Sequence, residues 1–329
     1  MRGVYDYDRG ISAVDVLFER ERLNAVHIVV ERGRAAIIDT GTANGVGRVL
    51  QALAEKGISP EQVDYVILTH VHLDHAGGAG QLMARCPNAT LTVHPRGARH
   101  IIDPSRLLQA TVAVYGAQEA RRMYGEVLPV PAQRVRETPQ GATVSLAGRE
   151  FEIFDAPGHA RHHVVVRDGG SGGIFAGDCF GLSYRELDRD GLQFSFPTTS
   201  PSQFDPPALK RTIERIMAFE PPAVYVTHFG RLRDLRRLAR DLERLIDAHV
   251  TLAERHRGDG AERSARLREA VERLVLAEGE RQRWPLSAQE LRRVFGLDIE
   301  LNAQGLEAWL DATARNKVNR KSAFPSEKR

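Results

Sequence analysis

The sequence predicts an α/β fold with partly parallel strands, followed by a helical C-terminal part. Three observations support this fold class. A buried strand, a loop, a helix and a second strand follow one another between residues 63 and 94, an order typical of parallel pairing. Histidine or aspartate stands at four predicted strand ends, at residues 70–75, 159, 178 and 228. From Arg231 onward, leucines recur at helical spacing among charged residues.

The first 94 residues alternate short apolar segments with turns. Three strands of a meander are expected at Ala13–Phe18, Ala25–Glu31 and Arg34–Asp39. A helix over 43–56 has an apolar face and ends at Gly57. The elements expected next are a strand over 63–68, a helix over Ala76–Cys86 and a strand over Thr90–His94.

The middle of the chain is less regular at first. Helical pieces over Leu107–Tyr124 are expected to lie on the surface and to form a wall of the site. The strands predicted after them are 144–146, 151–154, 164–167, 174–176 and 223–226, with a helix over 206–219 that Asp205 caps. The aromatic, irregular segment 180–204 and the helices after residue 231 would cap the cleft.

The sequence pattern changes near residue 230, from short apolar segments to leucines at helical spacing. This change suggests two parts, residues 1–230 and a helical extension over 231–329. Helices are predicted over 261–278, 287–295 and 303–315, and the last dozen residues are polar and expected to fray.

Composition excludes several classes of protein. Lys and Arg number 46 and Asp and Glu 43, and the resulting charge of +3 does not indicate a nucleic-acid binder. The N-terminus lacks the apolar core of a signal peptide, and no stretch is long and apolar enough to span a bilayer. Two cysteines, Cys86 and Cys179, imply no disulfide framework. We therefore expect a cytoplasmic protein without membrane or nucleic-acid partners.

The strongest functional signal is Thr69–His75, where three imidazoles and one carboxylate fall within six residues. This stretch follows the buried strand 63–68, so its polar side chains are expected on a loop at the C-terminal end of a strand. Neutral imidazole and carboxylate suit zinc and other first-row metals. A histidine-rich surface loop is the alternative, but alternate histidines beside an Asp-His pair are hard to explain by solvation alone.

Five motifs, in order along the chain, resemble those of the metallo-β-lactamase superfamily, in particular its glyoxalase II-like and lactonase-like hydrolases. They are Asp39-Thr40-Gly41, the His-x-His-x-Asp-His loop at 70–75, Pro157-Gly158-His159, Gly177-Asp178 and Thr227-His228-Phe229-Gly230. The resemblance covers about the first 230 residues. It implies an αββα sandwich with a dinuclear metal site at one edge.

The resemblance also implies a role for each matching residue. The first metal would be held by His70, His72 and His159, the second by Asp74, His75 and His228, and Asp178 would bridge them. The implied cofactors are two divalent ions, with zinc preferred and iron or manganese as alternatives.

Such a site can work without a nucleophilic serine or cysteine. Three imidazoles leave an open metal position for water, and a second ion that shares this water supplies hydroxide at neutral pH. The expected reaction is hydrolysis of a small ester-like substrate: a thioester, lactone, carboxylic ester or phosphoester. Asp74 is expected to be a ligand that also orients the hydroxide, and Cys179 to be a small buried residue.

Further residues have weaker signals. Asp39 would brace a ligand histidine or the ligand loop, with a helix cap as the alternative, and His162 and His163 would orient a ligand or contact substrate, with structural roles as the alternative. An apolar substrate wall is expected from Phe180, Tyr184, Phe194 and Phe229, with core packing as the alternative for each. The Tyr184 hydroxyl would assist an oxyanion.

Two other functions compete with the hydrolase. A mononuclear iron persulfide dioxygenase would use the same first three ligands, and a non-catalytic binding module would keep the fold alone. His72 stands where oxygen-reducing diiron members of the superfamily often carry glutamate, which favours a hydrolase. The C-terminal arginines interleave with acids, so an ion-paired face or a homodimer contact is preferred over nucleic-acid binding. The expected partner is a small-molecule substrate.

Overall fold

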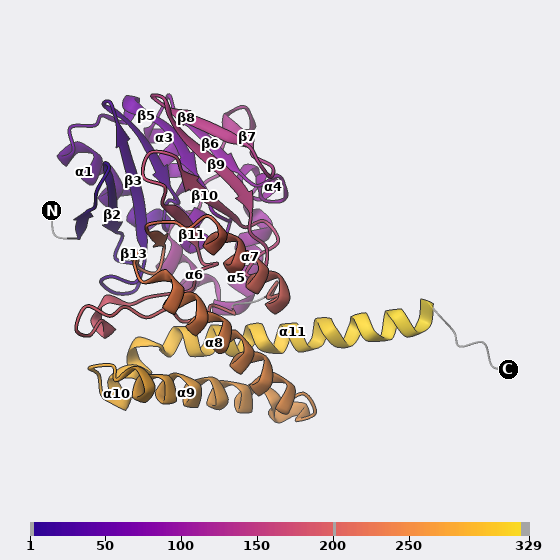
Figure 1. The fold of residues 1–329 in the computed structure, drawn as a ribbon. Helices are drawn as coiled ribbons and strands as arrows, with labels where there is room; N and C mark the ends of the chain where they lie inside the picture. Colours follow the sequence, from indigo (N-terminus) through magenta and orange to yellow (C-terminus); the bar gives the residue numbers. More distant parts are fainter. Residues whose placement is uncertain (1–2, 200–201, 324–329) are drawn as a thin grey trace.

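The structure, a computed structural model, describes residues 3–199 and 202–323, with side chains as far as residue 315 (Figure 1). Two β-sheets pack face to face between layers of helices, and further helices follow at the C-terminal side (Figure 1). The predicted αββα sandwich with a C-terminal helical extension is confirmed.

The first sheet has seven strands in sequence order. They are β1 (Val4–Asp6), β2 (Ile11–Asp15), β3 (Ala25–Glu31), β4 (Arg34–Ile38), β5 (Val63–Ile67), β6 (Thr90–Val93) and β7 (Val135–Glu137). Strands β1 to β4 pair antiparallel, and β4 to β7 pair parallel. The parallel pairing expected between residues 63 and 94 is therefore confirmed, with Val66 opposite Leu91.

The second sheet has six strands in the order β13-β12-β11-β10-β9-β8. Their bounds are β8 (Thr143–Leu146), β9 (Arg149–Asp155), β10 (Val164–Asp168), β11 (Ile174–Gly177), β12 (Val224–Val226) and β13 (Gly230–Leu232). Only β11 and β12 pair parallel, because α7 (Pro206–Ala218) lies between them in sequence and lets the chain cross over.

Both faces of the first sheet are buried, which explains its continuous apolar strands. Val29 and Ile38 point into the core between the two sheets, where they meet residues such as Phe151. Their neighbours Ile28 and Ile37 point the other way. On that side lie α1 (Val46–Glu55), α3 (Ala79–Arg85) and α4 (Pro95–Ile102).

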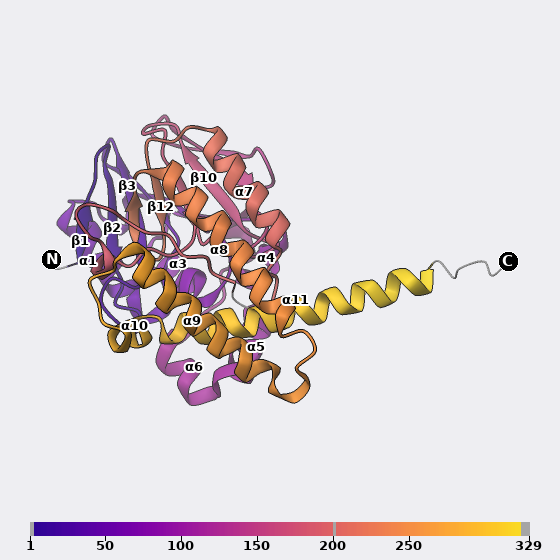
Figure 2. The same ribbon diagram turned by 60° about the horizontal axis from the view of Figure 1, so that its bottom comes forward.

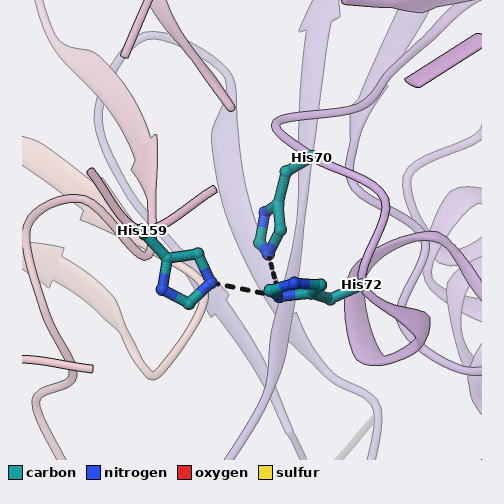
Figure 3. Close-up of side chains that lie close together, drawn as sticks. All are labelled: His70, His72 and His159. Carbon is teal, nitrogen blue, oxygen red and sulfur yellow. Dashed lines mark hydrogen bonds between the residues drawn. The ribbon is translucent and has the colours of Figure 1, made fainter. Parts of the chain in front are cut away.

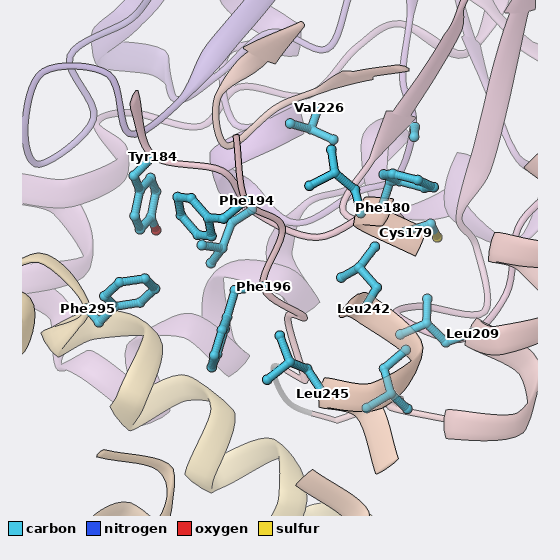
Figure 4. Close-up of a cluster of buried hydrophobic side chains, with 14 of the residues drawn as sticks. Cys179, Phe180, Tyr184, Phe194, Phe196, Leu209, Val226, Leu242, Leu245 and Phe295 are labelled. Atoms are coloured by element: carbon cyan, nitrogen blue, oxygen red, sulfur yellow. The ribbon is translucent and has the colours of Figure 1, made fainter. Parts of the chain in front are cut away.

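The other α-helices are α2 (Leu73–Ala76), α5 (Ser105–Tyr115), α6 (Ala117–Tyr124), α8 (Leu235–Arg255), α9 (Arg263–Gln282), α10 (Ala288–Val294) and α11 (Gly296–Ala323). Short 3-10 turns lie at Ala43–Gly45, Pro60–Gln62, Ala132–Arg134, Arg185–Leu187 and Gly260–Glu262. Helices α7 to α11 share one hydrophobic cluster with the second sheet, as Val226, Leu242 and Phe295 illustrate (Figure 4). In both ribbon views the C-terminal half of α11 extends beyond the rest of the molecule (Figures 1 and 2).

Several expected boundaries need correction. The helix expected over Ala76–Cys86 begins earlier, as α2, and restarts as α3. Strand β13 continues the second sheet two residues beyond the expected division at residue 230. The helix predicted over 303–315 is part of α11, which reaches Ala323 and so includes residues expected to fray; residues 324–329 lie outside the described residues. The three-residue strands β1, β7 and β13 were missed because each lies at a sheet edge and is too short for a clear alternating pattern.

Candidate metal centre

The seven residues expected to bind metal lie together at one edge of the sandwich. His70 and His72 follow β5, His159 follows β9, and Asp178 and His228 follow β11 and β12. Asp74 and His75 were expected on a loop, but they lie in the single turn of α2. The residues named from the sequence lie together, close enough to share metal ions, and a helical turn orients the last two ligand candidates.

His70, His72 and His159 bring three ring nitrogens to one point (Figure 3). Nε2 of His70 lies 2.9 Å from Nδ1 of His72, and Nε2 of His159 lies 3.1 Å from the same atom. Two nitrogens bound about 2.0–2.1 Å from a tetrahedral zinc ion would be roughly 3.3 Å apart. The three nitrogens are therefore spaced almost as the ligands of one ion are.

A second group of potential ligands lies beside the first. Nε2 of His228 is 3.3 Å from Oδ2 of Asp74, and Nε2 of His75 is 3.5 Å from the same oxygen. Asp178 lies between the two groups: Oδ2 is 3.5 Å from Nε2 of His159, and Oδ1 is 3.2 Å from Nε2 of His75. Each carboxylate oxygen of Asp178 thus faces a different group, an arrangement compatible with a bridging ligand.

Asp39 is the centre of the hydrogen bonds that support these ligands. Its carboxylate accepts from the backbone N–H and the hydroxyl of Thr69, from Nδ1 of His75 at 2.8 Å and from the hydroxyl of Thr227 at 3.1 Å. Because the Thr69 hydroxyl gives its proton to Asp39, it accepts from Nδ1 of His70, which lies 3.2 Å away. Both histidines therefore direct the lone pair of Nε2 toward the site.

Two more imidazoles are held in the same way. Nδ1 of His228 donates to the carbonyl oxygen of Leu23 at 2.9 Å, and Nδ1 of His159 lies 3.1 Å from the hydroxyl of Thr198. Metal-binding histidines usually engage their second nitrogen in this way.

The cluster also contains polar atoms that lack any protein partner. Nε2 of His75 and Oδ1 of Asp178 are buried and have no hydrogen bond among the described residues. Unsatisfied buried polar atoms are costly, so two of them facing each other in a ring of imidazoles fit a bound cation. The residues present fit a pair of divalent metal ions.

The protonation of the first group suits metal binding. Burial, helped by the neighbouring imidazoles, holds the pKa of His70 well below its usual range. Burial lowers the pKa of His72 to about 3 and also lowers that of His159. All three are neutral at pH 7, as metal ligands must be.

The second group is governed by its carboxylates. Burial alone would lower the pKa of His75, but Asp178, Asp74 and Asp39 outweigh it and hold the pKa well above its usual range. At His228 the same competition raises the pKa to about 8. The carboxylates thus concentrate negative charge here, which a cation would balance.

His163 supports the Asp178 turn and does not face the cavity. Its Nε2 accepts a hydrogen bond from the backbone N–H of Asp178 at 3.2 Å. Gly177 has a φ of +49°, and a Cβ atom there would lie 2.7 Å from both Nε2 of His163 and Oγ1 of Thr69. Only glycine permits this close packing.

Comparison with known proteins identifies the family of the chain. A family model described as the metallo-beta-lactamase superfamily matches residues 21–246. The chain belongs to the metallo-β-lactamase superfamily.

Two curated relatives are both named hydroxyacylglutathione hydrolase. The one from Synechococcus sp. is 34% identical over 148 residues, 45% of this chain and 44% of the relative. The one from Xanthomonas campestris pv. campestris is 30% identical over 185 residues, 56% and 53% of the two chains. This chain therefore spans about half the length of the curated relatives it matches.

Solved structures of the superfamily share the fold. A metallo-beta-lactamase superfamily protein from Sulfolobus tokodaii has a TM-score of 0.60 and 20% identity, covering 92% of this chain and 99% of that one. A metallo-beta-lactamase family protein from Thermus thermophilus has a TM-score of 0.59 and 20% identity, covering 93% and 94%.

In this metallo-β-lactamase superfamily member, several ligand candidates line a cavity of about 1190 Å³. His72, Asp74, Asp178 and His228 reach it directly. Helices α4 and α5 form one wall, which confirms the wall expected from Leu107–Tyr124. The lining also includes Thr198 and α11. The 180–204 segment, whose residues 200 and 201 lie outside the described residues, therefore contributes to the cavity as expected, whereas of the C-terminal helices only α11 does so within the described residues.

Of the four residues expected to form a substrate wall, only Tyr184 lines this cavity. Its hydroxyl donates to the carboxylate of Asp298 on α11, at 2.9 Å and 3.0 Å from the two oxygens. A phenol has one proton to donate, so this bond competes with the expected oxyanion contact. Arg20 lies over the ring, 4.2 Å from its centroid.

Phe180, Phe194 and Phe229 need correction, because they pack in hydrophobic clusters and do not line the cavity. Figure 4 shows Phe180 and Phe194 among the core side chains, and Phe229 packs edge-on against Tyr5. All three phenylalanines therefore have the alternative role, core packing. His162, in contrast, lines the cavity.

Sequence reasoning missed Asp298, Asn302 and Thr198. Each reaches the site from a segment without a recognisable motif, and two of them lie on α11, more than sixty residues after the last ligand. No local signal could have identified them, since only tertiary packing brings α11 to the cavity.

Proposed function

We propose that this chain hydrolyses an ester-like bond in a small molecule, using two divalent metal ions, and that a thioester is the best supported substrate. The observation that carries the proposal is the position of Asp178, whose two oxygens face different ligand groups beside one cavity. The curated relatives are hydroxyacylglutathione hydrolases by name, and an acyl group joined to glutathione is a thioester.

The ligand roles follow the distances. His70, His72 and His159 would hold one ion and Asp74, His75 and His228 the other, with zinc preferred for both because the donors are imidazoles and carboxylates. When bound, such ions would make water a stronger nucleophile and stabilise charge on the substrate carbonyl oxygen.

Protein residues would orient the attacking water. Asp74 is partly exposed to the cavity while His75 is fully buried, so the Asp74 carboxylate is placed to accept a hydrogen bond from the attacking water. The water oxygen adds to the carbonyl carbon, the bond from that carbon to the leaving sulfur or oxygen breaks, and the leaving group takes up the proton that the water gives up.

Cys179 is not the nucleophile. Its thiol is buried and donates to the carbonyl oxygen of Ala156 at 3.1 Å. Burial, together with the adjacent Asp178, raises the pKa of this thiol well above its usual range. A buried thiol that stays protonated is inert.

No helix within residues 3–199 and 202–323 is long and apolar enough to cross a membrane. The predicted partner is the small-molecule substrate, and a homodimer stays a prediction.

Metal quantitation and a substrate panel test the proposal together. Protein purified without added metal should contain up to two divalent ions per chain, and should hydrolyse at least one member of a panel of thioesters, lactones, carboxylic esters and phosphoesters. His70→Ala and Asp178→Ala should each lose metal and activity, whereas His256→Ala, at the far end of α8, should keep both.

Full activity of either ligand variant after exhaustive chelation would contradict the proposal. One iron per chain with thiol-dependent oxygen consumption would replace it with the persulfide dioxygenase.

A further inference from the structure

One side of the cavity is lined by basic side chains from three separate segments. Arg96, Arg99 and His100 lie on α4, Arg106 lies in the first turn of α5, and Arg161 lies in the turn that follows His159. The four arginines are exposed, and several ligand candidates line the same cavity.

Contacts between these segments bring the charges together. One guanidinium nitrogen of Arg96 donates to the carbonyl oxygen of Arg161 at 3.3 Å, which joins α4 to the turn after His159. Nε of Arg99 donates to Nε2 of His100 at 3.2 Å. The pKa of His100 is lowered, first by burial and then by the charges of Arg99 and Arg106. The cations are therefore near neighbours.

No carboxylate of the described residues forms a salt bridge with any of the four arginines. The acids that line the same cavity, Asp74, Asp178 and Asp298, face the ligand groups or Tyr184. Asp103, at the junction of α4 and α5, accepts a hydrogen bond from the backbone N–H of Ser105, the first residue of α5. Hydrogen bonds from Ser105, and then the charge of Arg106, lower the pKa of Asp103, so this carboxylate balances part of the positive charge. One carboxylate leaves most of the charge of four arginines unbalanced; like charges repel one another, and a bound anion would relieve that repulsion.

The adjoining wall has the opposite character. Leu107, Ala110 and Val114 lie on one face of α5 at helical spacing and line the cavity, with Leu297 and Leu301 of α11 nearby. Val114 is 53% exposed, although it belongs to a cavity-lining face. The α5 helix has no fully buried residue, so this apolar face is open to a ligand.

We propose that the substrate is an acyl thioester whose leaving thiol carries a phosphate group. The phosphate binds Arg96, Arg99, Arg106 and Arg161, and the acyl chain lies along α5. Guanidinium groups bind phosphate through paired hydrogen bonds, and a cluster of four suits a multiply charged group better than a single carboxylate. The cavity, about 1190 Å³, is also larger than the roughly 300–1000 Å³ of common small-molecule sites. This inference rests on the proposed function and names its substrate class.

Thioesters that share an acyl group and differ only in the thiol provide the test. Metal-loaded, full-length protein is assayed with S-hexanoyl pantetheine, S-hexanoyl 4′-phosphopantetheine and S-hexanoyl glutathione. The phosphorylated substrate should have a kcat/KM about tenfold or more above that of the neutral one, since a charge-assisted contact is typically worth a factor of this order. Added salt should reduce the difference.

Variants assign the effect to the arginines. Arg99→Ala and Arg106→Ala should bring the two values of kcat/KM close together by lowering only that of the phosphorylated substrate. Arg99→Lys should restore part of the preference. Arg211→Ala, an exposed arginine on α7 away from the cavity, should leave the preference unchanged.

Equal values for both substrates in the wild-type protein would overturn the inference while leaving the hydrolase proposal intact. An arginine-dependent preference for the glutathione thioester would also overturn it, because the recognised anion would then be a carboxylate. A binding titration with the S-methyl ethers of pantetheine and 4′-phosphopantetheine separates the two proposals. If no thioester is hydrolysed, but the phosphorylated ether binds more tightly and loses this advantage in Arg99→Ala, the anion site stands and the proposed reaction falls.

Discussion

Asn302, on α11, accepts a hydrogen bond from the backbone N–H of Thr199 at 2.7 Å through its side-chain oxygen. Its side-chain nitrogen donates to the carbonyl oxygen of Pro197 at 3.1 Å, so both polar ends of the amide hold the segment around Thr198. The Thr198 hydroxyl in turn lies 3.1 Å from Nδ1 of His159. A helix far along the chain thus positions a residue that contacts a metal-ligand candidate.

Asn302→Ala should weaken metal binding without touching any ligand. The backbone N–H of Thr199 loses its partner in a buried position, which costs about 1–3 kcal/mol of unfolding free energy. His159 loses part of its support, so metal affinity should fall by about tenfold or more. Competition with a chromogenic chelator measures the affinity, and Gln304→Ala on the same helix is the control. Wild-type affinity in Asn302→Ala would contradict this role.

Asp39→Asn should selectively disturb His75. An asparagine can still accept from Thr69, but its NH₂ group cannot accept from Nδ1 of His75. We expect metal affinity to fall about 10–100-fold, mainly for the ion held by the second group. Metal content after dialysis at graded chelator concentrations provides the measurement. Asp64→Ala, which removes a surface pair with Arg34, is the matched control and should have little effect. Retention of both ions by Asp39→Asn would argue against the brace.

Tyr184→Phe should change stability more than catalysis. The variant keeps the ring but leaves the half-buried Asp298 carboxylate without its hydroxyl donor. Burial already raises the pKa of Asp298 to about 6, and losing the donor should raise it further. A raised carboxyl pKa destabilises the fold as pH rises through it, so the loss should be small at pH 5 and about 1–3 kcal/mol at pH 8. Denaturant unfolding at the two pH values measures it. A large loss of kcat with unchanged stability would instead restore the oxyanion role.

His27 should make the protein less stable in acid. It lies on β3 against Phe175 and Tyr225, and burial lowers its pKa from 6.5 to about 3. The unfolded chain therefore binds a proton that the folded chain refuses, so stability is complete above pH 6.5 and falls as the pH drops toward 3. In the metal-saturated protein, His27→Phe should reduce the stability difference between pH 7 and pH 5 by about 2 kcal/mol. His256→Phe is the control. An unchanged difference in His27→Phe would refute the assignment.

The parts of the site that the sequence predicted share one property. His70 to His75, His159, Asp178 and His228 follow strands whose apolar patterns mark their ends, and the carboxyl ends of parallel strands meet at one edge of a sheet. Local pattern and general topology were therefore sufficient for the ligand cluster and for the sandwich.

The remaining parts depend on packing between distant segments. Phe180 and Tyr184 have similar local sequence signals and belong to the same hydrophobic cluster, yet only Tyr184 also lines the cavity. Asp298 and Asn302 lie on a helix whose polar residues look like those of any solvated face until α11 is placed against the 180–204 segment. The sequence does not show that the arginines of α4 and α5 line the same cavity as the ligand candidates; only the folded structure does.

The order of the elements along the chain has a consequence for biosynthesis. All seven ligand candidates precede residue 230, whereas α11, which covers part of the cavity, begins at Gly296. During synthesis, the residues that complete the cavity wall therefore leave the ribosome well after the last ligand candidate, so the finished cavity depends on the C-terminal part of the chain.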